Sequence, residues 1–269
     1  MLVSFNCVLI NKRWVLSAAH CIENIDVAKL NVYVGMEHYN PGAIYQDKVK
    51  IKQIISHPYW RNPPTDVDCP APFDVPYDIA LLELARETIS NDFASINGIN
   101  KHVDLPEGTE VTAIGMGDTE LGKTSEYLRK TIISIANPKR CIEVPSGYPP
   151  TCHKPALHIC AIGNNTITGG GDSGSPILAN DGNNTVVGLV SRRIMQSMQF
   201  TRVSYYSDWI LNNINKRTTC SIFSSKAVGA LVKSRCASSK KNTSFGFSTS
   251  PISGKRSKSS DNNHNKNTA

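Results

Sequence analysis

Three short segments of the sequence contain residue types that together could perform nucleophilic catalysis. His20 follows two alanines and precedes a cysteine, Asp78 begins an apolar run, and Ser173 lies in Gly-Asp-Ser-Gly. A serine hydroxyl becomes a good nucleophile when a neutral imidazole takes its proton, and a buried carboxylate fixes the tautomer of that imidazole. Glycines beside a serine allow a sharp turn that points backbone N–H groups at a developing oxyanion. The three segments therefore predict acyl-transfer chemistry.

The elements that must position these segments are predicted to be short strands. Before residue 204, β-branched and apolar runs recur with Gly, Pro, Asn and Asp between them, which is typical of an antiparallel sandwich or barrel. One amphipathic helix is predicted over residues 205–214, where apolar residues recur at three- and four-residue steps. The predicted strands include residues 29–34, 48–55, 79–84, 110–115, 130–135, 176–179, 185–190 and 199–203.

The formal net charge of +7 over 269 residues is unevenly distributed. Residues 216–269 hold 11 of the 29 lysines and arginines and one acidic residue, so residues 1–215 carry a net charge of −3. We therefore predict a folded domain over residues 1–215 and a basic, largely disordered tail over residues 216–269. Such a tail is compatible with weak polyanion contact, but specific nucleic-acid binding is not predicted.

Composition and cysteine content restrict the class of protein further. Hydrophobic residues make up 40% and charged residues 19%, which excludes a wholly disordered chain. No apolar run reaches the roughly 18–20 residues that a membrane span needs. Eight cysteines and three Asn-X-Ser/Thr sequons favour an oxidising compartment, and we predict a secreted protein.

With its three segments in the order His, Asp, Ser, the sequence resembles the chymotrypsin/trypsin-like serine endopeptidases over about residues 3–214. Weaker matches are Gly115-Met116-Gly117, Ser191 and Trp209-Ile210. The resemblance implies an all-β fold of two antiparallel Greek-key barrels, about 1–105 and about 106–215, with the active site between them and a C-terminal helix. It also implies a monomer with polypeptide substrates, protein inhibitors and no cofactor.

The same resemblance assigns a role to each candidate residue. His20 is the general base and acid, Asp78 orients it, and Ser173 is the nucleophile. The backbone N–H groups of Gly171 and Ser173 would form the oxyanion hole. Ser191 would support Asp78 and begin the strand along which an extended substrate pairs.

Asp172 raises a question about the start of the chain. In the family, zymogen cleavage exposes an apolar N-terminus whose ammonium group pairs with this aspartate, and the sequence has no matching segment. A buried Asp172 without a cation is costly. Three interpretations stay open: an N-terminally incomplete sequence, which we favour, another partner for Asp172, or a zymogen-like product.

The predicted substrate pocket departs from that of trypsin-type enzymes. Ile167, six residues before Ser173, occupies the position where those enzymes carry an aspartate, so no Lys or Arg preference is predicted. Arg193 and Met198 map to positions that are usually glycine, and both would narrow the pocket. A shallow pocket for small apolar side chains, selection of acidic side chains by Arg193, and a blocked pocket all remain open.

The resemblance also implies disulfides. The implied pairs are Cys7–Cys21, Cys141–Cys160 and Cys69–Cys152, which leaves Cys220 and Cys236 unassigned. The other histidines lack the spacing of metal ligands, so no metal site is predicted.

Two functions follow from the sequence. The first is a secreted serine endopeptidase, made as a zymogen, that hydrolyses peptide bonds through an acyl-enzyme. The alternative is a catalytically inactive protease homologue that binds proteins through the cleft. The complete Ser-His-Asp set favours the first, whereas the unusual pocket and the absent activation segment keep the second open.

Overall fold

The computed structural model of the chain describes residues 5–39, 42–61, 76–119, 121–141, 154–163, 168–194 and 197–224. The chain divides into two compact units, Met1–Ser225 and Lys226–Ala269, and all described residues belong to the first. Its strands are β1 (Val8–Asn11), β2 (Trp14–Ser17), β3 (Asn31–Val34), β4 (Asp47–Ser56), β5 (Ala80–Leu84), β6 (Ser95–Ile96), β7 (Glu110–Gly115), β8 (Arg129–Ile135), β9 (His158–Gly163), β10 (Pro176–Ala179), β11 (Thr185–Ile194) and β12 (Ser197–Arg202). Its helices are α1 (Ser207–Ser224) and the short 3-10 helices η1 (Ala19–Ile22), η2 (Val27–Lys29), η3 (Pro138–Cys141), η5 (Pro155–Leu157) and η6 (Val203–Tyr206).

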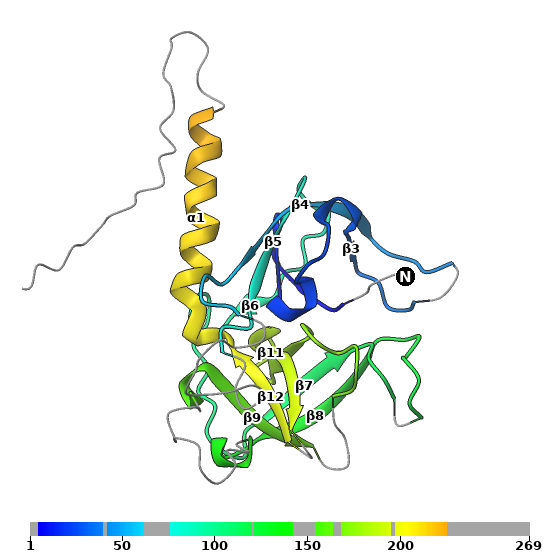
Figure 1. Cartoon of the computed structure of the whole chain (residues 1–269), viewed down its shortest axis with the longest axis vertical. Coiled ribbons are helices and arrows are strands. Elements are labelled where there is room, and N and C mark those ends of the chain that lie inside the picture. Colours follow the sequence, from blue (N-terminus) through cyan, green and yellow to red (C-terminus); the bar gives the residue numbers. More distant parts are fainter. Residues whose placement is uncertain are drawn as a thin grey trace, which may run out of the picture. The chain divides into compact units, whose positions relative to one another are not determined.

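The strands form two sheets in which every pairing except β6–β11 is antiparallel (Figure 1). The first has five strands in the order β1-β2-β5-β4-β3. The second has the order β10-β7-β8-β9-β12-β11-β6, and an additional β10–β11 pairing closes it into a barrel. The predicted all-β fold with two barrel-type sheets and a C-terminal helix is therefore confirmed, although the first sheet is an open half-barrel among the described residues.

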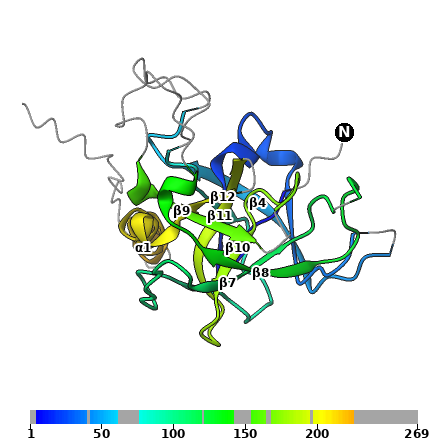
Figure 2. The same ribbon diagram turned by 90° about the horizontal axis from the view of Figure 1, so that it is seen from below.

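Two details differ from the sequence-based boundaries. β6 lies in the part of the sequence assigned to the first barrel, yet it pairs in parallel with β11 of the second sheet. Helix α1, seen nearly end-on in Figure 2, continues to Ser224 and so passes the predicted domain end at residue 215. Most of the predicted tail lies outside the described residues.

Strands β2 and β5 are buried along their whole length, because both of their faces pack against apolar cores. Successive side chains of a strand point to opposite faces. Val15 and Leu82 accordingly face the core of the first sheet, whereas Leu16 and Leu81 face a second core. Each fully buried leucine of this kind contributes about 1.5–3 kcal/mol. Burial on both faces fixes the position of the two strands that flank the candidate site.

The second of these cores joins the two sheets. Its members from the first sheet and its edge are Trp14, Leu16, Ile79 and Leu81, and its members from β11, η6 and α1 are Val186, Leu189, Val203, Tyr206 and Ile210. All of them are at most 3% exposed. Apolar residues of the predicted C-terminal helix thus pack in the core between the two sheets.

Candidate active site

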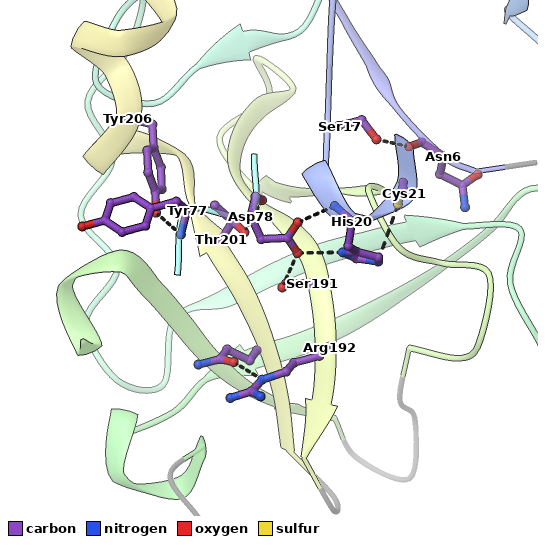
Figure 3. Close-up of polar contacts among 11 residues, drawn as sticks. Asn6, Ser17, His20, Cys21, Tyr77, Asp78, Ser191, Arg192, Thr201 and Tyr206 are labelled. Carbon is purple, nitrogen blue, oxygen red and sulfur yellow. Dashed lines mark hydrogen bonds and ion pairs between the residues drawn. The ribbon is translucent and has the colours of Figure 1, made fainter. Parts of the chain in front are cut away.

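His20 and Asp78 meet because β2 and β5 are paired strands. Their antiparallel register sets Ser17 opposite Ala80, so the end of β2 and the start of β5 lie at one edge of the sheet. His20 follows β2 in η1, and Asp78 precedes β5. The His20 Nδ1 atom lies 2.7 Å from Asp78 Oδ2, and the His20 backbone N–H donates to Asp78 Oδ1 at 2.9 Å. The register alone therefore brings the predicted base and its orienting carboxylate together (Figure 3).

Asp78 is completely buried, and the second sheet supplies further partners. The Ser191 hydroxyl donates to Asp78 Oδ2 at 2.6 Å, and the Thr201 hydroxyl donates to the Asp78 carbonyl at 2.8 Å. Ser191 sits where the β11–β12 register shifts between Val190 and Arg192, and a bulge of this kind re-aims one side chain. The buried carboxylate is thus satisfied by donors from both sheets, as a buried charge requires.

The backbone just before Asp78 is held in an unusual conformation. Tyr77 has a left-handed φ of 63°, which is uncommon for an aromatic residue. Its N–H donates to the Tyr206 hydroxyl at 3.2 Å, and its ring stacks on His57 at 4.9 Å between centroids. Such a conformation persists only where its surroundings enforce it. Tyr206 therefore helps to fix the backbone before Asp78 and, through it, the orientation of the Asp78 side chain.

The charge state of His20 depends on its neighbours. Burial alone would lower the pKa of His20, but hydrogen bonds and charges from Asp78 and Cys21 raise it from 6.5 to about 10. The His20–Asp78 ion pair therefore stabilises the fold below pH 6.5, and this contribution is lost as the pH rises through about 10. A general base must be neutral, so in this arrangement proton abstraction by His20 is favoured at alkaline pH.

Cys7 and Cys21 are free thiols in the structure, which differs from the implied Cys7–Cys21 disulfide. The Cys21 sulfur lies 3.6 Å from His20 Nε2. Burial, together with the charge of Cys21, raises the pKa of Cys7 to about 12. The implied pair Cys141–Cys160 is a disulfide with 5.7 Å between its Cα atoms. The implied Cys69–Cys152 pair, Cys236 and the Cys220 side chain lie outside the described residues.

Replacing Cys21 with alanine is expected to move the acidic limb of the kcat/KM profile to lower pH. The reason is that Cys21 contributes to the raised pKa of His20. Hydrolysis of a peptide substrate measured from acidic to alkaline pH tests this, with Cys7→Ala as the matched control that leaves the Cys21 contact in place. Identical profiles for the wild-type and Cys21→Ala proteins would contradict the prediction.

The loop that carries Ser173 packs directly against the end of β2. Gly174 has a left-handed φ of 78°, and a Cβ atom there would collide with Ser17 Oγ and the Asn6 carbonyl. On its other side the loop is tied to β11, because Gly174 N–H donates to Val190 O at 2.9 Å and Val190 N–H donates to Ser175 O at 2.8 Å. Glycine at position 174 is thus what allows Ser173 to come close to the His20 segment.

Ser173 itself does not yet bond to the base. Within the described ranges, no hydrogen bond links the half-buried Ser173 hydroxyl to His20, whose Nε2 atom faces Cys21 instead. The structure therefore joins His20, Asp78 and Ser191 by hydrogen bonds and places Ser173 in the adjoining loop. In a structure without substrate, catalytic hydrogen bonds are often long or unformed.

The predicted oxyanion donors are the N–H groups of Gly171 and Ser173. Each N–H shares a peptide group with the carbonyl of the preceding residue, and both of these carbonyls accept a hydrogen bond. Gly170 O accepts from Asp118 N at 2.7 Å, and Asp172 O accepts from Ser175 N at 3.0 Å. In a trans peptide the N–H points away from the C=O, so the N–H groups of Gly171 and Ser173 point away from these partners. Neither N–H donates to another residue in the described part of the chain. Both are therefore available to an oxyanion.

Asp172 is bonded to backbone donors in this structure. Gly117 N donates to Asp172 Oδ1 at 2.7 Å and Gly169 N donates to Oδ2 at 2.8 Å. Burial raises the pKa of Asp172, while the two hydrogen bonds act in the opposite direction. A Cβ at Gly115 or Gly117 would collide with the Asp172 carboxylate, which explains why Gly-Met-Gly flanks it.

A cavity of about 610 Å³ is lined mainly by β7, β8 and the segment between these strands, and by the segment that precedes Ser173. Gly169, Gly170 and Asp172 line one side of it, and the exposed Arg193 lies at its edge. Met198 is completely buried, and its sulfur accepts a hydrogen bond from Thr168 N at 3.2 Å. Ile167 lies outside the described residues. Of the predicted pocket residues, Arg193 thus lines this cavity, whereas Met198 contacts the lining residue Thr168.

Two residues that hold the site were not among the sequence-based candidates. Thr201 binds the Asp78 carbonyl, and Asn6 contacts the Ser173 loop through its side chain, donating to Gly171 O at 2.7 Å. A threonine in a strand and an asparagine before one are common, so neither carries a sequence signal. In the described part of the chain, no group of His, Cys, Asp or Glu side chains could hold a metal ion, and no helix is long and apolar enough to cross a membrane.

Comparisons with known proteins identify one family whose members are similar to this chain. Residues 4–210 match the family model described as Trypsin. Chymotrypsin-like elastase family member 1 of Canis lupus familiaris is 28% identical over 217 residues, covering 77% of this chain and 79% of the relative. Trypsin 5G1 of Aedes aegypti is 27% identical over 219 residues, covering 75% of this chain and 72% of the relative.

Solved structures show the same fold. The Vibrio cholerae VesB protease superposes with a TM-score of 0.61 at 24% identity, over 78% of this chain. The matched part of the chain spans 59% of the VesB chain. At this identity the likeness concerns the fold alone.

Proposed function

Because the chain belongs to the trypsin family of serine proteases, we propose that it is an endopeptidase that hydrolyses peptide bonds with Ser173, His20 and Asp78. The observation that carries the proposal is the 2.7 Å His20–Asp78 contact around a fully buried carboxylate. A carboxylate on the surface would leave the imidazole free to rotate, whereas the buried Asp78 fixes the tautomer and the orientation of the His20 ring. The Ser173 loop, tied to both sheets, supplies the nucleophile.

The proposed reaction follows from these positions. His20 Nε2 takes the proton from Ser173 Oγ while that oxygen attacks the substrate carbonyl carbon, and the N–H groups of Gly171 and Ser173 bind the resulting oxyanion. The proton then passes to the leaving amine, which departs and leaves the acyl-enzyme. In the second half of the reaction His20 takes a proton from water, whose oxygen attacks the acyl carbon; the ester bond to Ser173 Oγ then breaks, this oxygen receives the proton, and the acid product leaves. The imidazole must exchange its Cys21 contact for Ser173 before the first step.

Substrate is proposed to bind as an extended chain beside residues 191–193 of β11. Main-chain pairing of this kind supplies affinity, and the adjoining pocket supplies selectivity. Because the Met198 side chain is buried beneath Thr168, we propose a shallow pocket for short side chains. Polypeptides are the proposed substrates, and we propose that the protein is secreted, made as a zymogen and open to protein inhibitors.

Replacing Met198 with alanine is expected to widen the pocket. The variant should gain cleavage after large aromatic residues by roughly tenfold relative to short ones, as expected when apolar groups in a pocket change. A peptide-library cleavage profile of the wild-type, Met198→Ala and Arg193→Ala proteins measures this. A loss of acidic preference in Arg193→Ala alone would instead favour selection by the arginine, and strong cleavage after Lys or Arg would contradict the proposed pocket.

Covalent labelling tests the proposed function directly. A fluorophosphonate probe is expected to modify Ser173 in the full chain, and peptide mapping should identify that residue. The Ser173→Ala protein should not be labelled, whereas Ser175→Ala, in the same loop, is expected to keep labelling. If Ser173 stays unmodified after the protein has been treated with an activating protease, the chain is not an active peptidase, and the inactive protein-binding homologue becomes the better description.

A further inference from the structure

Asn6 connects the segment before His20 to the loop that carries Ser173. Its side-chain Nδ2 donates to Gly171 O at 2.7 Å, and its backbone N–H donates to Ser173 O at 3.3 Å. Its own carbonyl accepts from the Ser17 hydroxyl at 2.8 Å, and Ser17 is the last residue of β2. Figure 3 shows Asn6 beside Ser17, on the side of η1 away from Asp78. One residue therefore contacts both parts of the proposed machinery.

The loop needs such external contacts because its own backbone is permissive. Gly170 and Gly171 are adjacent glycines, and Gly171 has a φ of 85°, so no Cβ atom restricts rotation of the peptides on either side. The preceding peptide is held through Gly170 O by Asp118 N at 2.7 Å. The following peptide is held through Gly171 O by Asn6 Nδ2. Together the two contacts fix both torsions of Gly171.

The orientation of Gly171 matters because its N–H is a proposed oxyanion donor. Rotation of the Gly171–Asp172 peptide would change ψ of Gly171. The N–H groups of Gly171 and Ser173 would then lose their orientation relative to each other. The Asn6 side chain prevents this rotation from outside the loop, and it is itself anchored to β2 by Ser17. A donor aimed at the oxyanion before the reaction costs no reorganisation during it.

We propose that Asn6 is a positioning residue: it holds the proposed oxyanion donors, Gly171 and Ser173, at a fixed position relative to the segment that carries His20. The inference rests on the proposed peptidase function. The hydrogen bonds of Asn6 go to the backbone of Gly171 and Ser173 and to the Ser17 hydroxyl, so its effect passes through Gly171 and Ser173. Its side chain is specific in this role, because the backbone contacts to Ser173 and Ser17 do not depend on the side chain, except in proline, whereas the contact to Gly171 O requires a side-chain donor.

The test uses Asn6→Asp, which keeps the shape of the side chain but replaces the N–H donor with an acceptor facing Gly171 O. Asn180→Asp is the matched control. Asn180 Nδ2 also donates to a distant backbone carbonyl, Glu110 O at 3.3 Å, and Asn180 also accepts a hydrogen bond, from Thr112. It directly follows β10 and has no hydrogen bond to the Ser173 loop among the described residues. Both changes thus remove one exposed amide-to-carbonyl bond and add one negative charge.

In the full chain, Asn6→Asp is expected to lower kcat and the rate of fluorophosphonate labelling by about 10- to 100-fold, because small misplacement of a catalytic group has effects of this size. KM should change little, and the affinity for a peptide boronate should fall in parallel with kcat. Hydrogen–deuterium exchange of the segment around residues 168–176 should rise. Asn180→Asp should match the wild type in all four measurements.

Each outcome decides the inference. Unchanged labelling or unchanged loop exchange in Asn6→Asp would overturn it, and so would equal losses in both variants, since these would reflect general destabilisation. If the wild-type protein is not labelled at Ser173, the proposed function fails, but exchange in the loop still shows whether Asn6 holds it. Faster loop exchange in Asn6→Asp alone supports the positioning role.

Discussion

Replacing His20 with alanine is expected to lower kcat on a peptide substrate by a factor on the order of 10⁶, because loss of one member of a catalytic triad removes nearly all of its effect. The structure supports an effect of this size, since His20 is the acceptor proposed for the Ser173 proton and Asp78 has no other imidazole partner among the described residues. Turnover of an amide substrate and the rate of Ser173 labelling should fall together.

His102→Ala is the control for this change. His102 also pairs with an aspartate, Asp104, at 3.2 Å, but its side chain is 78% exposed and lies away from the site. Exposed pairs contribute about 0–1 kcal/mol, so the variant should retain activity and stability. A His20→Ala protein that retained a tenth or more of the wild-type kcat would show that another group acts as the base, at odds with the proposed mechanism.

Replacing Asp78 with asparagine is expected to lower kcat by about 10⁴-fold while leaving the fold intact. Asp78 accepts hydrogen bonds on both oxygens, from the His20 backbone on Oδ1 and from His20 Nδ1 and Ser191 on Oδ2. An asparagine has a single acceptor oxygen. If that oxygen faces the backbone N–H, the amide donates to Nδ1, and Nε2 must then carry the proton and cannot take another.

Ser191→Ala separates this tautomer effect from simple loss of a hydrogen bond. It removes one donor to Asp78 Oδ2 and leaves the carboxylate and the His20 contacts in place. One hydrogen bond to a charged group is worth about 1.5–3 kcal/mol, so a loss of roughly 10- to 100-fold is expected. Equal losses in Asp78→Asn and Ser191→Ala, measured as kcat/KM on one substrate with melting temperatures in parallel, would argue against control of the tautomer.

Much of the fold could be predicted because strand patterning in this chain is local. The apolar runs at residues 79–84, 110–115 and 176–179 correspond to β5, β7 and β10. Residues 199–203 overlap β12, and the start of α1 falls within the predicted helix. Such patterns are visible because buried strands are continuous in the sequence. Helix α1 is longer than the predicted helix over residues 205–214, because beyond residue 214 the polar composition conceals the helix.

The candidate site was predictable in its residue types but not in its contacts. The order His, Asp, Ser identifies the side chains, and the pairing of β2 with β5 then explains why His20 and Asp78 touch. The thiol contact of Cys21 with His20 could not be foreseen, because it depends on a side-chain rotamer. The Asn6 bond to Gly171 spans 165 positions in the sequence, and no local pattern encodes such a contact.

The core that joins the two sheets has a consequence for how the protein would lose function. The base and its carboxylate belong to the first sheet and the nucleophile loop to the second, so the catalytic constellation exists only while this core is closed. Separation of the sheets would scatter these groups even if each sheet kept its own core. Loss of activity under mild denaturant would therefore report whether the joining core is closed, and loss of β-sheet signal would report the two sheets themselves.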